Sequence, residues 1–303
     1  MEKQNTTVTG QVSAEFERMA VKVSMVSIIG NAVLSLLKFL AGIFAHSGAM
    51  VSDAVHSASD VFSSIIVIIG VKLSTRAPDK EHPYGHERFE CVAAIILAVV
   101  LLVTGLLIGR SALEQVIKGD FTGTEAPGLL ALAAAVVSIV SKEAMYWYTR
   151  YYAKKLDSGA LMANAWHHRS DALSSIGALI GIIFARMGYR IVEPIASLVI
   201  CLLILKATYD IFRDAVSKMV DSGDPALEQE IREVAGKQED VLGVDLIHTR
   251  VFGNRIYVDI EISADGNMTL EQGHAVAEKV HDVIESSFPK VKHIMVHVNP
   301  AKF

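Results

Sequence analysis

The sequence predicts an α-helical membrane protein with a small α+β domain at its carboxyl end. Residues 91–109 read CVAAIILAVVLLVTGLLIG and contain no charged residue. A helix of that length rises roughly 28 Å, close to the ~30 Å thickness of a bilayer core. Five other long apolar segments accompany this one. After Phe212 the pattern changes to shorter runs with the periods of surface helices and strands.

The apolar segments divide the chain into regions. We expect six spans at about residues 23–45, 49–73, 91–113, 127–148, 159–185 and 191–212. Residues 1–22 then form a cytoplasmic amino-terminal segment, which lacks the apolar stretch of a cleavable signal. Residues 23–212 form the transmembrane domain and residues 213–225 a linker. Lys142 and Glu143 interrupt the fourth segment near its end.

Basic residues indicate the orientation in the membrane. Most lysines and arginines near the spans fall in residues 1–22 and in the loops after the second and fourth segments. The opposite side would hold only Arg110, Lys118, Arg186 and Arg190. Since positive charge is enriched on the cytoplasmic side, both termini are expected in the cytoplasm.

Charge and cysteine content exclude other classes. The net charge is −5 and no long basic stripe is present, which argues against nucleic acid as a partner. Cys91 and Cys201 both lie in apolar segments, so they indicate buried apolar side chains and no disulfide framework.

Residues 226–303 have the pattern of a separate α+β domain. We expect a helix at 226–237, strands at 241–251 and 255–263, a helix at 270–286 and a strand at 291–298. In the second strand Ile256, Val258 and Ile260 alternate with other residues, which is the period of a half-buried strand. Thr269 is a suitable amino-terminal cap for the second helix.

Two matching His-x-x-x-Asp pairs lie within predicted spans. His56 and Asp60 are on the second, and His167 and Asp171 are on the fifth. The spacing of four residues stacks both side chains on one helix face. An aspartate in hydrocarbon costs on the order of 3 kcal/mol, so the repeated pattern indicates a shared use. Two imidazoles and two carboxylates suit tetrahedral Zn²⁺.

Other polar residues on these spans have less definite roles. Asp53 and Asn164 each precede a histidine of the pairs by three residues, so they would either orient the imidazoles or line a wet cavity. Asn31 is expected to form an interhelical hydrogen bond. His168 and Arg169 point to other faces of the fifth helix and are given no metal role.

The loop between the second and third spans gathers further potential ligands. Asp79, His82 and His86 fall within eight residues, and Pro83 and Gly85 bend the backbone between them. The loop could hold one ion with all three side chains. A solvated polar loop remains the alternative reading.

Taken together, these motifs resemble the cation diffusion facilitator family over nearly the whole chain. The resemblance implies a ferredoxin-like cytoplasmic domain and a homodimeric metal/proton antiporter that exports zinc or related divalent ions. By position, His56, Asp60, His167 and Asp171 match the transport site. Asp79, His82 and His86 match the loop site. The His–Asp–His–Asp set favours Zn²⁺.

The resemblance extends less completely to a cytoplasmic metal site. His274 and His297 match family ligands, with His248 nearby on the first strand. Three further positions depart from the histidine, histidine and aspartate of the well-known bacterial members: Asp245, Glu261 and Asn299. Metal binding by this domain is therefore left open.

Two further expectations follow from the resemblance. Arg88 and Asp221 match an ion pair that links the membrane and cytoplasmic parts. The loop at residues 150–158 lacks the histidine-rich insert of eukaryotic vesicular members, which favours the plasma membrane of a prokaryote.

The expected function is therefore Zn²⁺ efflux in exchange for protons, with Mn²⁺, Fe²⁺, Cd²⁺ or Co²⁺ as alternative substrates. An intramembrane metalloenzyme is disfavoured because the string His86-Glu87-Arg88-Phe89-Glu90 lacks the second histidine of a zinc protease. A four-ligand set also leaves no open position for a catalytic water. A membrane metal sensor is the other alternative.

Overall fold

The computed structural model describes residues 2–44, 48–119, 129–186 and 191–301. The chain divides into two compact units. One consists of residues 10–215, and the other of residues 216–303 together with residues 1–9.

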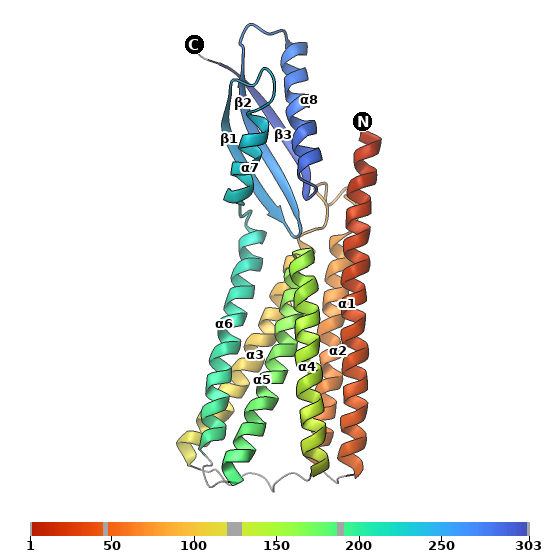
Figure 1. The fold of residues 1–303 in the computed structure, drawn as a ribbon, viewed down its shortest axis with the longest axis vertical. Coiled ribbons are helices and arrows are strands. Elements are labelled where there is room, and N and C mark those ends of the chain that lie inside the picture. The colour runs from red at the N-terminus through yellow and green to blue at the C-terminus, as the bar shows by residue number, and fades with distance from the viewer. Residues whose placement is uncertain (1, 45–47, 120–128, 187–190, 302–303) are drawn as a thin grey trace. The chain divides into compact units, whose positions relative to one another are not determined.

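Long helices that run side by side make up the first unit (Figure 1). They are α1 (Glu2–Phe44), α2 (Gly48–Ser74), α3 (Phe89–Lys118), α4 (Leu129–Leu156), α5 (Gly159–Arg186) and α6 (Val192–Met219). Two described segments pass a test of length and hydropathy for a membrane span, residues 14–41 of α1 and the whole of α3. The most apolar stretch of α3 has a mean hydropathy of 3.1, compared with 1.8 for that of α1.

The outer surface of this unit is apolar. On α3, Leu97 and Leu101 are buried inside the bundle, while Leu106 and Leu107 are exposed. Leu202 of α6 is likewise exposed. A helix that is apolar both toward the protein and away from it is typical of a membrane environment.

The first helix begins well before the predicted apolar span. It starts at Glu2, whereas the apolar segment starts at about residue 23. Residues 2–22 contain no proline, so no proline prevents this polar stretch from forming the first part of the helix. Phe16 and Ala20 of this stretch are buried. Hydropathy therefore indicates where the helix becomes apolar, but it does not indicate where the helix begins.

Small side chains allow α2 to approach α3 closely. A Cβ atom on Gly70 would lie 2.4 Å from the Cβ atom of Ala93, which is closer than two carbon atoms can pack. Ala160 and Ala163 of α5 are also fully buried in the same apolar core. This close packing keeps α2 and α5 near enough for their polar side chains to meet.

The second unit contains a three-stranded sheet with two helices. Its elements are α7 (Pro225–Ala235), β1 (Gly243–Phe252), β2 (Arg255–Ala264), α8 (Leu270–Ser287) and β3 (Val291–Pro300). Strand order is β1-β2-β3, with β1 antiparallel and β3 parallel to β2. The predicted elements are confirmed to within a few residues, and Thr269 forms a capping box with Gln272.

Both helices cover one face of this sheet. Ile231 of α7 and Ile284 of α8 are completely buried against Val258, Ile260 and Ile262 of β2. Because side chains alternate along a strand, the intervening residues of β2 lie on the opposite face. That face includes Asp259 and Glu261, which are only partly buried. The fold is the expected ferredoxin-like α+β arrangement.

Candidate metal site

Two helices bring three predicted ligands together inside the first unit. Asp60 comes from α2, and His167 and Asp171 come from α5. All three are nearly inaccessible to solvent, with Asp60 only 2% exposed. One ligand atom from each lies within 4.8 Å of the other two. The distance from His167 Nε2 to Asp60 Oδ1 is 3.3 Å.

The fourth predicted ligand, His56, lies on α2 one helical turn before Asp60. Its side chain, like that of Asp53, lies outside the described part of the structure. The spacing of four residues places His56 and Asp60 on the same face of α2. The complete four-ligand set therefore remains a prediction.

A buried lysine stands beside these carboxylates, and the sequence analysis gave it no role. Lys142 Nζ of α4 donates to Asp60 Oδ2 at 2.5 Å and to Asp171 Oδ2 at 2.9 Å. The apolar run suggested a span ending near Tyr148, which put Lys142 at its end. However, α4 continues to Leu156, so Lys142 is near the middle of the helix. An ionisable group within a membrane segment was the signal that could have identified it.

Other polar groups around the cluster take different positions from those expected. Asn164 Nδ2 donates to Ser64 Oγ of α2 at 3.5 Å, so it links the two helices. Asn31 is fully buried, but neither polar atom of its amide has a hydrogen-bond partner among the described residues. The predicted interhelical hydrogen bond of Asn31 is therefore not seen among the described residues.

His168 is not part of the Asp60–His167–Asp171 group, and Arg169 contacts α4 instead. His168 is fully buried, and neither of its ring nitrogens has a hydrogen-bond partner among the described residues. Arg169 forms an ion pair with Glu143 of α4. Its guanidinium also lies 4.7 Å from the centre of the Tyr146 ring.

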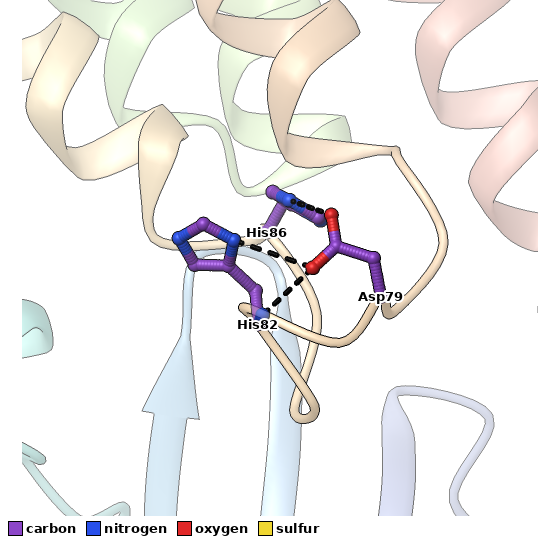
Figure 2. Close-up of side chains that lie close together, drawn as sticks. All are labelled: Asp79, His82 and His86. Carbon is purple, nitrogen blue, oxygen red and sulfur yellow. Dashed lines mark hydrogen bonds and ion pairs between the residues drawn. The ribbon is translucent and has the colours of Figure 1, made fainter.

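The loop between α2 and α3 gathers the second predicted cluster (Figure 2). Asp79 Oδ1 is 3.5 Å from His82 Nδ1, and Asp79 Oδ2 is 3.3 Å from His86 Nε2. The two imidazole rings have centroids 4.5 Å apart. His86 is buried, whereas about half of the side chains of His82 and Asp79 is exposed. Potential ligand atoms of all three lie within 4.8 Å.

The backbone of this loop fixes the position of the Asp79 carboxylate and favours its ionised form. The backbone N–H groups of His82 and Glu81 donate to Asp79 Oδ1 at 2.7 Å and 2.9 Å. The His82 hydrogen bond is the main influence that holds the pKa of Asp79 below its ordinary value. Gly85 has a φ of 101°, a conformation that lets the chain turn back toward Asp79. The carboxylate thus stays ionised and available to a cation.

The open face of the sheet holds a hydrogen-bonded group of predicted cytoplasmic ligands. Asn299 Nδ2 of β3 donates to Asp245 Oδ2 and to Glu261 Oε2, both at 3.1 Å. Ser263 Oγ donates to Asp245 Oδ2 at 2.6 Å. Hydrogen bonds from Ser263 and then Asn299 lower the pKa of Asp245 below its usual value. An amide therefore joins the two carboxylates.

The three histidines of the predicted cytoplasmic site are spread over different elements. His274 of α8 is exposed and lies 3.6 Å from Glu278 of the same helix. His297 pairs in register with Glu261, and His248 with Asp259. Among the described residues, the potential ligand groups do not include this set; α8 instead offers His281, Asp282 and Glu285 on its surface. His274 and His297 do not form a described ligand group, because α8 packs on the face of the sheet that holds Ile294, whereas His297 pairs with Glu261 on the open face.

The predicted Arg88–Asp221 pair joins positions in different units. Arg88 immediately precedes α3, and Asp221 follows α6 with a φ of 63°. Arg88 and Asp221 each make at least one polar, ionic or ring contact in the structure. Their coupling stays a prediction.

Comparison with known proteins identifies both parts of the chain. Residues 24–220 match the family model of the cation efflux transmembrane domain. Residues 224–301 match the model of the cation efflux protein cytoplasmic domain. The two matches meet at the linker between α6 and α7.

Relatives that match over most of this chain agree with these matches. An uncharacterized transporter of Methanocaldococcus jannaschii is 36% identical over 91% of this chain and 96% of its own. The manganese efflux system protein MneP of Bacillus subtilis is 32% identical over 95% of this chain and 99% of its own. Metal tolerance protein C1 of Arabidopsis thaliana is 34% identical over 92% of this chain and 62% of its own. The chain belongs to the cation diffusion facilitator family of divalent-metal efflux transporters, which are not enzymes.

Proposed function

We propose that the chain is a proton-coupled antiporter that exports a divalent transition-metal ion through a site formed by His56, Asp60, His167 and Asp171. The observation that supports this most directly is the pair of buried carboxylates from α2 and α5, whose ligand atoms lie within 4.8 Å of each other and of His167. A divalent cation would neutralise both carboxylates at once. In a low-dielectric interior that compensation is far stronger than in water.

Zinc is the substrate that the ligand chemistry favours. Two imidazoles and two carboxylates form a closed tetrahedral set, with zinc–ligand distances of ~2.0–2.2 Å. Manganese is the second candidate, because the relative from Bacillus subtilis is named a manganese efflux system protein and covers nearly the whole chain. Oxygen ligands also suit Mn²⁺, so the two carboxylates would serve either ion.

Protons would drive export by competing with the metal for the same atoms. An imidazole binds a metal ion only when neutral, and a carboxylate only when ionised. Free imidazole protonates near pH ~6.5, so a modest gradient changes its occupancy. Metal loads from the cytoplasm and leaves toward a more acidic exterior as the helices alternate access to the site.

The remaining features fit this arrangement. Helices α1–α6 would each cross the plasma membrane of a prokaryotic cell, with both termini in the cytoplasm. Two copies would associate as a homodimer, and Asp79, His82 and His86 would bind a further ion near the membrane surface. Light scattering of the full chain in detergent tests the dimer, and a monomeric mass would contradict it.

Reconstitution into sealed proteoliposomes tests the proposal. Uptake of Zn²⁺, Mn²⁺, Fe²⁺, Cd²⁺ and Co²⁺ is measured with and without a pH gradient, with protein-free vesicles as the control. We expect Zn²⁺ flux that rises with the gradient and is accompanied by proton movement. Metal binding without flux would instead indicate a membrane metal sensor.

A further inference from the structure

The side chain of Lys142 occupies the space between the two carboxylates of the proposed transport site. Its ammonium group donates to one oxygen of Asp60 and one oxygen of Asp171, which come from different helices. Only 2% of Lys142 is exposed. The ammonium thus holds the position, relative to both carboxylates, that a bridging cation would take.

A metal ion and this ammonium compete for the same oxygens. Lys142 Nζ lies 2.5 Å from Asp60 Oδ2 and 2.9 Å from Asp171 Oδ2. A bound zinc ion would lie ~2.0–2.2 Å from each coordinating oxygen. The second oxygen of Asp60, Oδ1, already faces His167. The two cations therefore cannot both take the bridging position between Asp60 and Asp171.

Charge favours the same exclusion. Two carboxylates and one ammonium sum to −1, and two carboxylates with a divalent ion sum to zero. If both cations stayed, the buried group would carry +1, and the cations would repel at short range in a medium of low dielectric. The lysine side chain has a flexible four-carbon stem, so its ammonium can withdraw while the α4 backbone stays in place.

We propose that the Lys142 ammonium is the resident cation of the unloaded transport site, and that the incoming metal ion displaces it from Asp60 and Asp171. This inference rests on the proposed function of the same cluster. Lys142 then has two effects. It compensates the carboxylates when no metal is bound, and it returns to them as metal leaves. The tethered cation weakens metal binding and speeds metal release. Without it, the site would hold the metal ion too tightly for rapid transport.

The test compares metal affinity in full-length variants at one mildly alkaline pH, where protons compete least. Lys142→Met removes the charge, and Lys142→Gln removes the charge while it keeps an N–H donor. Affinities for Zn²⁺ and Mn²⁺ are measured by competition with a fluorescent chelator. We expect both variants to bind metal tighter by on the order of tenfold, and to transport it more slowly. Lys142→Arg keeps the charge and should bind no tighter than the wild type.

A matched control separates displacement from simple loosening of the bundle. Glu143→Gln removes the neighbouring ion pair between α4 and α5, with Arg169, without touching the carboxylates. It should leave metal affinity unchanged. If Lys142→Met does not fold, Lys142→Gln gives the same comparison.

Unchanged or weaker metal affinity in the neutral variants would overturn the inference, because Lys142 would then support the site without competing for it. This failure differs from failure of the proposed function. If the wild-type chain itself neither binds nor transports any of the metals, the proposed function is wrong. If the wild type transports metal and only the variant affinities disagree, the displacement alone is wrong.

Discussion

The two Asp–His clusters of the first unit contain similar ligands in opposite surroundings. In each, potential ligand atoms lie within 4.8 Å of one another. Asp60 and Asp171 are buried and receive an ammonium from a third helix. Asp79 is half exposed and is held by backbone N–H groups of its own loop. One cluster contains an internal counter-cation, whereas the other relies on backbone N–H groups and on its exposure.

This difference follows from the cost of burying charge. A carboxylate at the surface of a loop keeps most of its hydration, so two N–H donors are enough to keep it ionised. Two carboxylates inside a helix bundle cannot be hydrated in this way and need a cation. A buried site must therefore exchange one cation for another, while an exposed site can stand empty.

Removing a carboxylate of the buried cluster should abolish transport. Asp60→Asn or Asp171→Asn is expected to reduce metal flux on the order of 100-fold or more, since even outer partners of metal ligands cost ~10–100-fold. Flux into proteoliposomes measures this. Glu114→Gln, an exposed carboxylate of α3 paired with Arg110, is the control and should be neutral. Undiminished flux in either aspartate variant would remove these residues from the site.

Changing the predicted fourth ligand should alter metal choice. His56→Asp replaces an imidazole by a third carboxylate, and oxygen ligands suit Mn²⁺ better than nitrogen does. We expect the ratio of Mn²⁺ to Zn²⁺ transport to rise about tenfold, equivalent to ~1.4 kcal/mol. Competition between the two ions in the same vesicles measures the ratio. A constant ratio would mean that His56 does not touch the metal.

The loop cluster should respond more mildly and with a different dependence on pH. Since the folded carboxyl of Asp79 has the lower pKa, its contribution to loop order is complete above the ordinary value of 3.8 and is lost as the pH falls through the lower folded value. A loss of loop metal between pH ~7 and ~5 would therefore not come from this carboxyl.

Asp79→Asn should weaken binding to the loop about tenfold and leave that acidic loss in place. Equilibrium binding in an Asp171→Asn background isolates the loop from the buried site. If the acidic loss disappears in Asp79→Asn, the carboxylate and not the imidazoles controls the pH dependence.

The predicted link between the two units should have a modest effect. Reversing the charge of Arg88 alone is expected to lower the transport rate by no more than about fivefold, since surface ion pairs contribute ~0–1 kcal/mol. Reversing Asp221 as well should restore part of the rate. Transport assays of both single variants and the double variant measure this. A double variant no better than the worse single variant would show that the residues are not coupled.

The sheet surface should give the smallest change. Asn299→Asp replaces the amide that joins Asp245 and Glu261 with a third carboxylate. Without an N–H donor the three acidic groups repel one another. A divalent ion should relieve this repulsion, so the variant should bind the ion weakly, but more tightly than the wild type does. Isothermal titration with Zn²⁺ in the Asp171→Asn background measures the gain. Equal binding with and without the substitution would leave the hydrogen-bonded group a structural one.

Local patterns in the sequence determine much of this protein. The fold class, the α+β unit and the cap at Thr269 follow from hydropathy, strand alternation and helix-start chemistry, which act over a few residues. The i, i+4 spacing of His167 and Asp171 likewise determines that both lie on one face of α5, since helix geometry alone requires it.

Only the tertiary structure decides which helices face one another. Helical periodicity predicts which residues of α4 share a face with Lys142, but it does not predict which carboxylates of other helices that face contacts. Burial of α4 against α5, and the close approach of α2 allowed by small residues such as Gly70, bring the ammonium to Asp60 and Asp171. His274 is the opposite case, because α8 covers the face of the sheet opposite to the one that holds Glu261 and His297, so matching a family ligand position does not by itself bring it to His297. Contacts between elements depend on the packing of whole surfaces, which no short window of sequence contains.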